Sequence, residues 1–419
     1  MVIRIDYLIY VYMTLCLCML AYNLFYLGKN KWMQRRTEKQ IQNQARRLQR
    51  FLLFPEKTSS DVDEKIKKKL KRTHQLVILE GTVETLEQNP LTVKPLQAWL
   101  LTLKPVFTEL IDVYMKKSVM ERSYFAYLVT RFGLCGQTSH DPIASAMIQL
   151  TAVSSIYCRE NTLTALYAHG SIEQIVKAYR VLARHEIEHS RKMVTDGLLE
   201  FHGDREQLAE AFWQNWDEFT PHYQVAFIDF IRMVSGNFRE TLYPLLSQPE
   251  TDREVTFAVM RYFRKYPYHP AGDVLRQIVR EWAKRDWEYA AIAAASLESY
   301  PEMETIKALL IGVQSDNWYV RDNASDSLLR LAKPLAILEM IRQMNDSYGR
   351  DMLRYKALSA GLIQLEPETE QLVLSTASDP SLKEESPTVL AGWQRLAGTQ
   401  SPPASKEALP SLQEWEDEK

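Results

Sequence analysis

A helical pattern that recurs along most of the chain sets the strongest limit on its fold. In each copy, an anchor residue is followed by small or apolar side chains three, seven and ten positions later. Arg321, for example, is followed in this way by Ala324, Leu328 and Leu331. Side chains with this spacing lie on one face of an α-helix. Eight copies fit the pattern, with anchors at Arg122, Arg159, Arg191, Tyr223, Arg253, Trp287, Arg321 and Tyr355.

The distance between successive anchors is nearly constant, at 30 to 37 residues. A period in this range is typical of stacked helix pairs, in which each pair buries its apolar face against the next. A helical bundle is the alternative, but bundles have no fixed repeat length. The chain also has only 14 Gly in 419 residues, about half the usual share of roughly 7%, and so lacks the glycines that β-rich folds use in turns. We therefore predict an all-α protein with about eight helix pairs, beginning near residue 106.

One copy carries a family resemblance. The segment from Asp316 to Leu331, DNWYVRDNASDSLLRL, resembles the second helix of a HEAT repeat, and weaker versions cover roughly residues 106–365. The chain is thus similar to membrane-anchored bacterial HEAT-repeat proteins. The resemblance implies an α-solenoid with a concave surface built from the second helices. It also implies a scaffold or adaptor that binds a protein partner, for example a membrane-associated enzyme such as a glycosyltransferase, and it implies neither catalysis nor a cofactor.

A stretch of 21 residues without any charge runs from Tyr7 to Leu27. At about 1.5 Å per residue a helix of this length spans about 30 Å, which is the hydrocarbon thickness of a bilayer. A cleaved signal peptide is the alternative, but the apolar run is longer than about 15 residues and no small-residue cleavage site follows before Lys29. We predict an uncleaved transmembrane helix.

The charges that flank this stretch predict its orientation. Eight cations and a single acid, Glu38, follow the run, whereas Arg4 and Asp6 precede it. The positive-inside rule therefore places the C-terminal side in the cytoplasm. We expect a single-pass protein of the cell membrane. In order, the sequence divides into an outside stub (1–6), the transmembrane helix (7–27), a basic juxtamembrane helix (29–54), a helical region with the repeats (61–365), and a degenerate cap with an acidic disordered tail (366–419).

The basic juxtamembrane helix has two interpretations. In the first it lies on anionic lipid head groups, which attract cations near the membrane surface. In the second it is a solvated flank that only fixes topology. Its candidate lipid contacts are Arg35, Arg36, Arg46, Arg47 and Arg50, and its loosely spaced apolar face consists of Trp32, Ile41, Leu48, Phe51 and Leu52. In the acidic tail, Leu412 and Trp415 form a candidate docking motif, although most such tails only solvate.

One segment has the form of a catalytic motif, His185-Glu186-Ile187-Glu188-His189. On a continuous helix the two histidines could bind zinc while Glu186 activates a water, as in a zinc-dependent hydrolase. The repeat register instead places this segment at the turn between two helices, which would separate the imidazoles. We therefore expect a charged turn and no metal, and we keep a membrane-anchored zinc hydrolase as the alternative function.

Aromatic and cationic side chains give the candidate protein-binding residues, since Trp, Tyr and Arg dominate the energetics of interfaces. The candidates are Trp213, Trp216, Arg261, Arg264, Trp282 and Trp318, although a Trp at helical spacing more often lies in the core between repeats. The formal net charge of −2 does not provide the basic surface that nucleic acid requires. We expect a protein partner at the membrane, and no nucleic acid.

Overall fold

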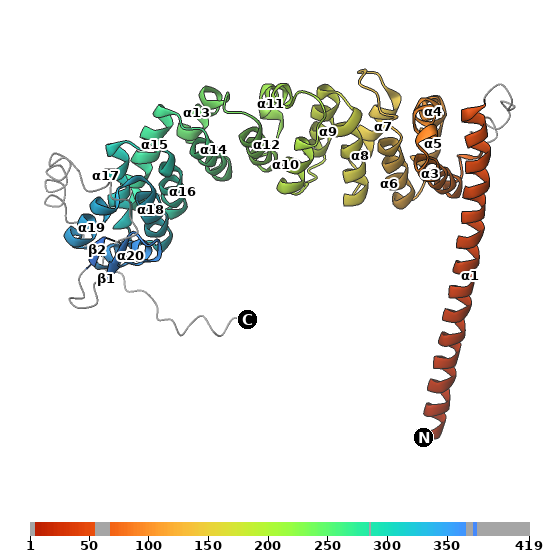
Figure 1. The fold of residues 1–419 in the computed structure, drawn as a ribbon, viewed down its shortest axis with the longest axis horizontal. Helices are drawn as coiled ribbons and strands as arrows, with labels where there is room; N and C mark the ends of the chain where they lie inside the picture. Colours follow the sequence, from red (N-terminus) through yellow and green to blue (C-terminus); the bar gives the residue numbers. More distant parts are fainter. Residues whose placement is uncertain (1–4, 55–67, 285, 366–371, 375–419) are drawn as a thin grey trace. The chain divides into compact units, whose positions relative to one another are not determined.

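The computed structural model describes residues 5–54, 68–284, 286–365 and 372–374. Within these ranges the chain is helical, with 19 α-helices and one antiparallel pair of strands (Figure 1). The chain forms two compact units, Met1–Val234 and Ser235–Lys419. The all-α prediction is confirmed except for the strands β1 (Ile363–Leu365) and β2 (Leu372–Leu374), in which Ile363 pairs with Leu374.

The first unit contains α1 and the helices from α3 to α12. Their bounds are α1 (Ile5–Leu53), α3 (Thr73–Glu87), α4 (Pro90–Leu101), α5 (Lys104–Tyr114), α6 (Val119–Arg131), α7 (Pro142–Leu150), α8 (Ile156–His169), α9 (Ile172–Arg184), α10 (Arg191–Leu199), α11 (Arg205–Gln214) and α12 (Pro221–Val234), with the 3-10 turn η2 (Trp216–Glu218).

The second unit contains the helices from α13 to α20 and the two strands. The helix bounds are α13 (Arg239–Ser247), α14 (Arg253–Lys265), α15 (His269–Arg280), α16 (Trp287–Ser296), α17 (Met303–Val313), α18 (Trp318–Leu331), α19 (Pro334–Gln343) and α20 (Ser347–Ser359), with the 3-10 turns η3 (Trp282–Lys284) and η4 (Leu297–Ser299).

From α5 onward the helices form consecutive pairs, and each of the eight anchors lies in the second helix of its pair. In the first unit, α6 packs on α8, α8 on α10 and α10 on α12, while α5, α7, α9 and α11 form a second row. In the second unit, α14, α16, α18 and α20 pack in the same order. Most residues at the predicted positions line the seams, as the fully buried Ala324 and Leu328 do, whereas Met233, at the last position of its copy, is 54% exposed. Two rows of helices in each unit are consistent with an α-solenoid.

Polar side chains set where these helices begin. Ser118 accepts a hydrogen bond from the backbone of Glu121, whose carboxylate accepts one from the backbone of Ser118, and this capping box starts α6. Ser171 and Gln174 start α9 in the same way. Asp141 and Asn317 cap α7 and α18 by accepting from backbone N–H groups inside each helix.

The helix α1 is continuous across both N-terminal segments that the sequence predicted separately. Its last turns pack on α3 and α4, where Ala45 and Leu48 are buried and Ile41 lies against Gly81. The apolar face around Ile41 and Leu48 therefore packs on protein, whereas the lipid contact expected of the basic side chains on this helix stays a prediction. The physical reason is that α3 offers a close-packed apolar surface within the chain itself.

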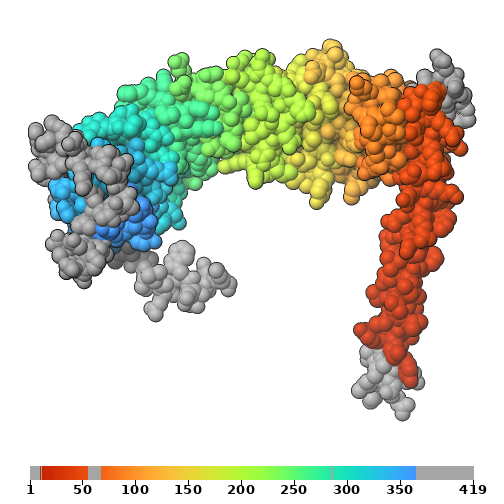
Figure 2. All heavy atoms as spheres, in the orientation of Figure 1, coloured from red at the N-terminus to blue at the C-terminus, as the bar shows by residue number. Residues whose placement is uncertain are grey.

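The described side chains from Tyr12 to Leu27 are exposed (Figure 2). Within the described residues, no helix reaches both the length and the apolarity that crossing a membrane requires. The transmembrane span predicted for residues 7–27 is therefore not confirmed, and the side chains of Tyr7, Leu8, Ile9 and Val11 lie outside the described part. The predicted acidic tail, with Leu412 and Trp415, also lies outside it.

Candidate partner-binding surface

Four large aromatic side chains stand exposed where successive second helices of the second unit begin. They are Trp287 at the start of α16, Trp318 and Tyr319 at the start of α18, and Tyr348 at the start of α20. Their exposed fractions are 40%, 52%, 53% and 72%. We call these four residues the aromatic row. Each helix start has a similar local sequence, with an aspartate followed within two residues by an aromatic ring (DWEY, DNWY and DSYG).

Capping and packing fix the rings of α18 in place. The Asn317 side chain accepts hydrogen bonds from the backbone of Tyr319 and Val320, at 2.9 and 3.3 Å, so the first turn of the helix is well defined. Val320 is fully buried with Ala290 and Ala291 of α16. Because Val320 points into this core, the two residues that precede it are directed toward solvent.

The rings also contact one another across neighbouring helices. The rings of Trp287 and Tyr319 are stacked, with centroids 4.9 Å apart and planes 18° apart. Trp318 meets Tyr319 edge to face at 5.2 Å. The guanidinium of Arg321 lies 5.5 Å from the ring centroid of Tyr348. These contacts lower the conformational freedom of the row, so less entropy is lost when a partner binds to it.

Carboxylates flank the aromatic row. Asp286 and Asp316 are exposed, and neither caps a helix through its side chain, because α16 has no side-chain cap and α18 is capped by Asn317. Glu288 pairs with Arg253 at 3.7 Å. The windows 286–289, 316–319 and 346–349 contain no Lys or Arg. Cations stand just outside these windows, at Lys284, Arg321 and Arg350, so the helix starts carry charges of both signs beside the rings.

The four predicted protein-binding residues of the second unit differ in their surroundings. Trp318 belongs to the aromatic row. Trp282 of η3 is half-buried against the cluster of Ala290, Ala291 and Val320, as a core Trp would be. Arg264 of α14 pairs with Glu298 at 2.6 Å, and the half-buried Arg261 lies one turn earlier.

The remaining candidates lie in the first unit. Trp213 and Trp216 are half-buried and form a ring pair with centroids 4.9 Å apart, at the junction of α11 and η2. Arg180 holds this junction by donating to Asn215 and to Glu218, the latter at 2.7 Å.

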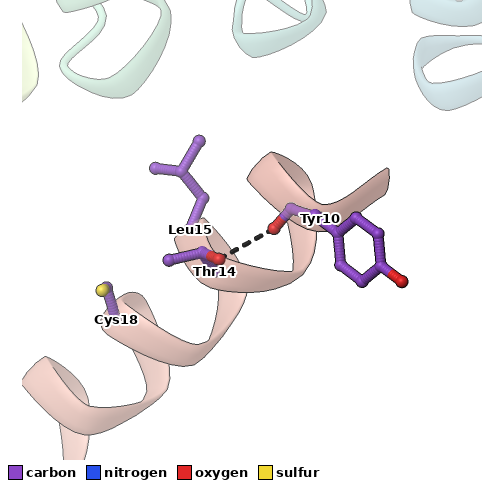
Figure 3. Close-up of a pocket in the computed structure, with 4 residues that line it drawn as sticks. All are labelled: Tyr10, Thr14, Leu15 and Cys18. Atoms are coloured by element: carbon purple, nitrogen blue, oxygen red, sulfur yellow. Dashed lines mark hydrogen bonds between the residues drawn. The ribbon is translucent and has the colours of Figure 1, made fainter. Parts of the chain in front are cut away.

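The candidate lipid contacts are all exposed on α1, and they are Arg35, Arg36, Arg46, Arg47 and Arg50. The guanidinium of Arg36 lies 5.4 Å from the ring centroid of Trp32. Figure 3 shows a shallow hollow on the same helix, lined by Tyr10, Thr14, Leu15 and Cys18. Its lining comes from successive turns of one helix, so the hollow is part of an open helix surface.

The segment 185–189 forms a turn. The helix α9 ends at Arg184, His185 is an exposed C-cap, and Glu186 has a φ of 53°. His189 lies beyond the turn, where it is buried and its Nε2 contacts Glu160 of α8. The two imidazoles therefore do not share a helix face, as zinc binding by this motif would require. Among the described residues, no group of three or more His, Cys, Asp or Glu side chains is arranged to hold a metal ion.

The aromatic content of the sequence drew attention to Trp287 and Tyr319, but neither they nor Tyr348 were chosen as candidate binding residues. The signal that could have found them is the repeated placement of an aspartate and an aromatic ring at a helix start. The chain was also compared with protein-family models, with curated proteins and with solved structures, and nothing in any of the three matches it.

Proposed function

We propose that the chain is a membrane-anchored scaffold of the HEAT-repeat type that binds a protein partner through the aromatic row. The observation that carries the proposal is the exposure of Trp287, Trp318, Tyr319 and Tyr348 at successive helix starts. Large aromatic side chains supply most of the binding energy of protein interfaces. The contacts among the rings cover only part of their surface, and a group of exposed aromatic side chains on one edge supports a binding role.

The anchor in this proposal is residues 7–27 of α1, with the rest of the chain on the cytoplasmic side. Its support is the uncharged sequence together with the exposure of the described side chains up to Leu27. Because α1 continues without a break to its contact with α3 and α4, the anchor is joined to the first unit by a helix. A continuous helix holds the anchor at a fixed distance from α3 and α4, whereas a flexible linker would not.

The helical rise limits which cations reach lipid. If the hydrocarbon ends near Leu27, Arg35 and Arg36 lie within about 14 Å of it along the helix axis, whereas Arg46 lies about 28 Å away. Attraction to a charged membrane surface falls off within a Debye length of about 8 Å at physiological salt. We therefore assign head-group contact to Arg35 and Arg36. A chain confined to the membrane meets a membrane-bound partner at a raised effective concentration.

Partner capture from native membranes tests the proposal. The tagged full chain is compared with the double variant Trp318→Ala/Tyr319→Ala and with Tyr157→Ala, a control that removes a ring of the first unit that is 77% exposed. We expect one or more proteins to be enriched by the unaltered chain and by the control, and to be lost with the double variant. Equal enrichment by all three, or none by any, would contradict the assignment of the row as the binding surface.

Membrane fractionation tests the anchor separately. Leu17→Arg places a charge in the middle of the apolar run, at a cost of about 2.5–3.5 kcal/mol for insertion. Leu101→Arg makes the same change at an exposed position of α4 and serves as the control. We expect Leu17→Arg alone to raise the share of chain that carbonate extracts from membranes. Complete extraction of the unaltered chain would refute the anchor.

A further inference from the structure

We infer that the aromatic row binds a proline-containing segment of this same chain, residues 401–412 (SPPASKEALPSL), an inference that rests on the proposed function of the row as a binding surface. The segment lies outside the described residues and begins 27 positions after the end of β2. Bound in this way, it occupies the row until an external partner displaces it. The rings, the charges around them and the length of chain after β2 all point to this occupant.

The exposed rings of the row offer both apolar faces and hydrogen-bond donors. Tyr319 is stacked on Trp287, and Trp318 meets Tyr319 with its plane turned by 87°. Rings at such an angle can contact the ring of a proline on two sides. Among the described contacts, no hydrogen bond engages the indole N–H of Trp318 or the hydroxyls of Tyr319 and Tyr348. These groups are therefore available to donate to the carbonyls of a bound chain.

Proline-containing segments are a class of peptide that exposed aromatic side chains bind. In the polyproline II conformation the backbone carbonyls make no internal hydrogen bonds and accept from donors on the binding surface. Each proline also fixes its own φ and restricts the residue before it, so less conformational entropy is lost on binding. The segment contains Pro402, Pro403 and Pro410, with Leu409 and Leu412 as apolar neighbours. The chain therefore carries a ligand of this class in its own sequence.

The charges around the row favour a segment without net charge. The helix starts carry both signs, for example at Asp316 and Arg321. A strongly acidic or strongly basic segment would meet like charges on this surface, which costs affinity. The segment has one cation, Lys406, and one anion, Glu407, whereas residues 413–419 have four acids and one lysine. The proline-containing segment thus fits the mixed charges better than the acidic stretch that follows it.

The chain after β2 is long enough to bring the segment to the row. Tyr348 lies at the start of α20, whose 13 residues span about 20 Å, and β1 follows the end of this helix. Trp287 lies on α16, which packs on α18 as α18 packs on α20, so it is about 20 Å from α20 at the usual 8–10 Å between helix axes. A chain of 27 residues spans up to about 90 Å. The segment therefore reaches every ring of the row, and its tether gives it an effective concentration of about 1 mM.

Competition between the tethered segment and the same sequence as a free peptide tests the inference. Fluorescence anisotropy gives the Kd of a labelled peptide of residues 401–412 for the full chain in neutral detergent micelles. If the peptide binds an open row with a Kd of about 0.1 mM, the tethered segment should raise its apparent Kd about tenfold. The triple variant Pro402→Ala/Pro403→Ala/Pro410→Ala should open the row, so the labelled peptide should bind it about tenfold more tightly than it binds the unaltered chain.

Matched variants separate the segment and the row from their surroundings. Pro380→Ala/Pro387→Ala removes two prolines between β2 and the segment, and it should leave the apparent Kd within about twofold of that of the unaltered chain. Adding Trp318→Ala/Tyr319→Ala to the triple variant should abolish binding of the peptide. Adding Tyr157→Ala, which removes an exposed ring of the first unit, should not.

Three results would overturn the inference. They are an equal Kd for the unaltered chain and the triple variant, binding that survives the loss of Trp318 and Tyr319, and no binding of the peptide to any variant. If capture from membranes depends on Trp318 and Tyr319 while the peptide binds no variant, the proposed function stands and this inference fails. If the peptide binds through the row but no protein is captured, the segment is an occupant of the row and the proposed partner binding fails.

Discussion

Replacement of Leu48 by alanine should release the end of α1 from α3 and α4. Leu48 has 0% exposure and lies in the contact that joins α1 to α3 and α4, beside the buried Ala45. Truncation of a fully buried leucine costs about 2–5 kcal/mol, which includes the cavity that remains. Because the described contacts of α1 with α3 and α4 include the buried Leu48, we expect the loss to weaken the docking of α1 rather than the packing of α5 to α12.

The expected change in docking is large enough to measure locally. A loss of about 3 kcal/mol lowers the ratio of docked to undocked α1 by a factor of about 150. Hydrogen exchange with mass spectrometry on the full chain in detergent micelles follows the amides of residues 41–53, which should exchange faster by up to that factor because an undocked helix end unfolds more readily. Leu101→Ala is the matched control, since Leu101 is 60% exposed at the end of α4 and should change exchange little.

Two results would refute this reasoning. Unchanged exchange in residues 41–53 of the Leu48→Ala variant would mean that the docked arrangement does not form in solution. Faster exchange spread evenly over α5 to α12 would mean that α1 and the repeats unfold together, so that α1 is part of one cooperative unit. Either outcome would also remove the basis for treating α1 as a helical connection between an anchor and the first unit.

Two further predictions concern pH and a buried hydroxyl. Hydrogen bonds donated by Thr73 and Ser118 lower the pKa of Glu121 from 4.5 to about 2. The stability that these bonds supply should therefore be full above pH 4.5 and be lost as the pH falls toward 2. In an acid titration followed by NMR at α6, the Glu121→Gln variant should lack this pH dependence. The Tyr300 hydroxyl accepts a hydrogen bond from the backbone of Tyr268 and donates one to the carbonyl of Phe263, both at 3.2 Å. Tyr300→Phe should therefore destabilise the second unit by about 1–3 kcal/mol. Calorimetry measures this loss, and an unchanged Tm would contradict the prediction.

The repeats could be predicted from sequence because their information is local. A helix that must bury one face shows it as a spacing of three, seven and ten residues, and the burial of Phe125 and Val129 after Arg122 follows directly. The small sheet could not be predicted in the same way. The segments Ile363–Leu365 and Leu372–Leu374 are three residues each, and their pairing depends on a partner strand rather than on a local period.

What covers the apolar face of the basic part of α1 could not be predicted from sequence for a similar reason. A helical stripe that contains Ile41 and Leu48 shows that one face is apolar but not what covers that face. Lipid and protein are equally compatible with the pattern. The deciding feature is Gly81 on α3, whose missing side chain lets Ile41 approach closely, since a Cβ there would lie 2.6 Å from Ile41 Cδ1. That contact joins residues 40 positions apart and has no signature in either segment alone.

The aromatic row shows where local rules stop explaining a residue. Helix starts favour acidic caps, and the capping of Asp346 accounts for one aspartate at this edge. The same rule does not require Asp286 or Asp316, and core packing does not require Trp318, because Val320 already fills the seam beside Ala290 and Ala291. Residues that neither capping nor packing needs are expected where a chain meets something else. Trp282 has the same residue type in a neighbouring turn but is half-buried in that seam, so exposure rather than composition separates Trp318, a proposed binding residue, from Trp282.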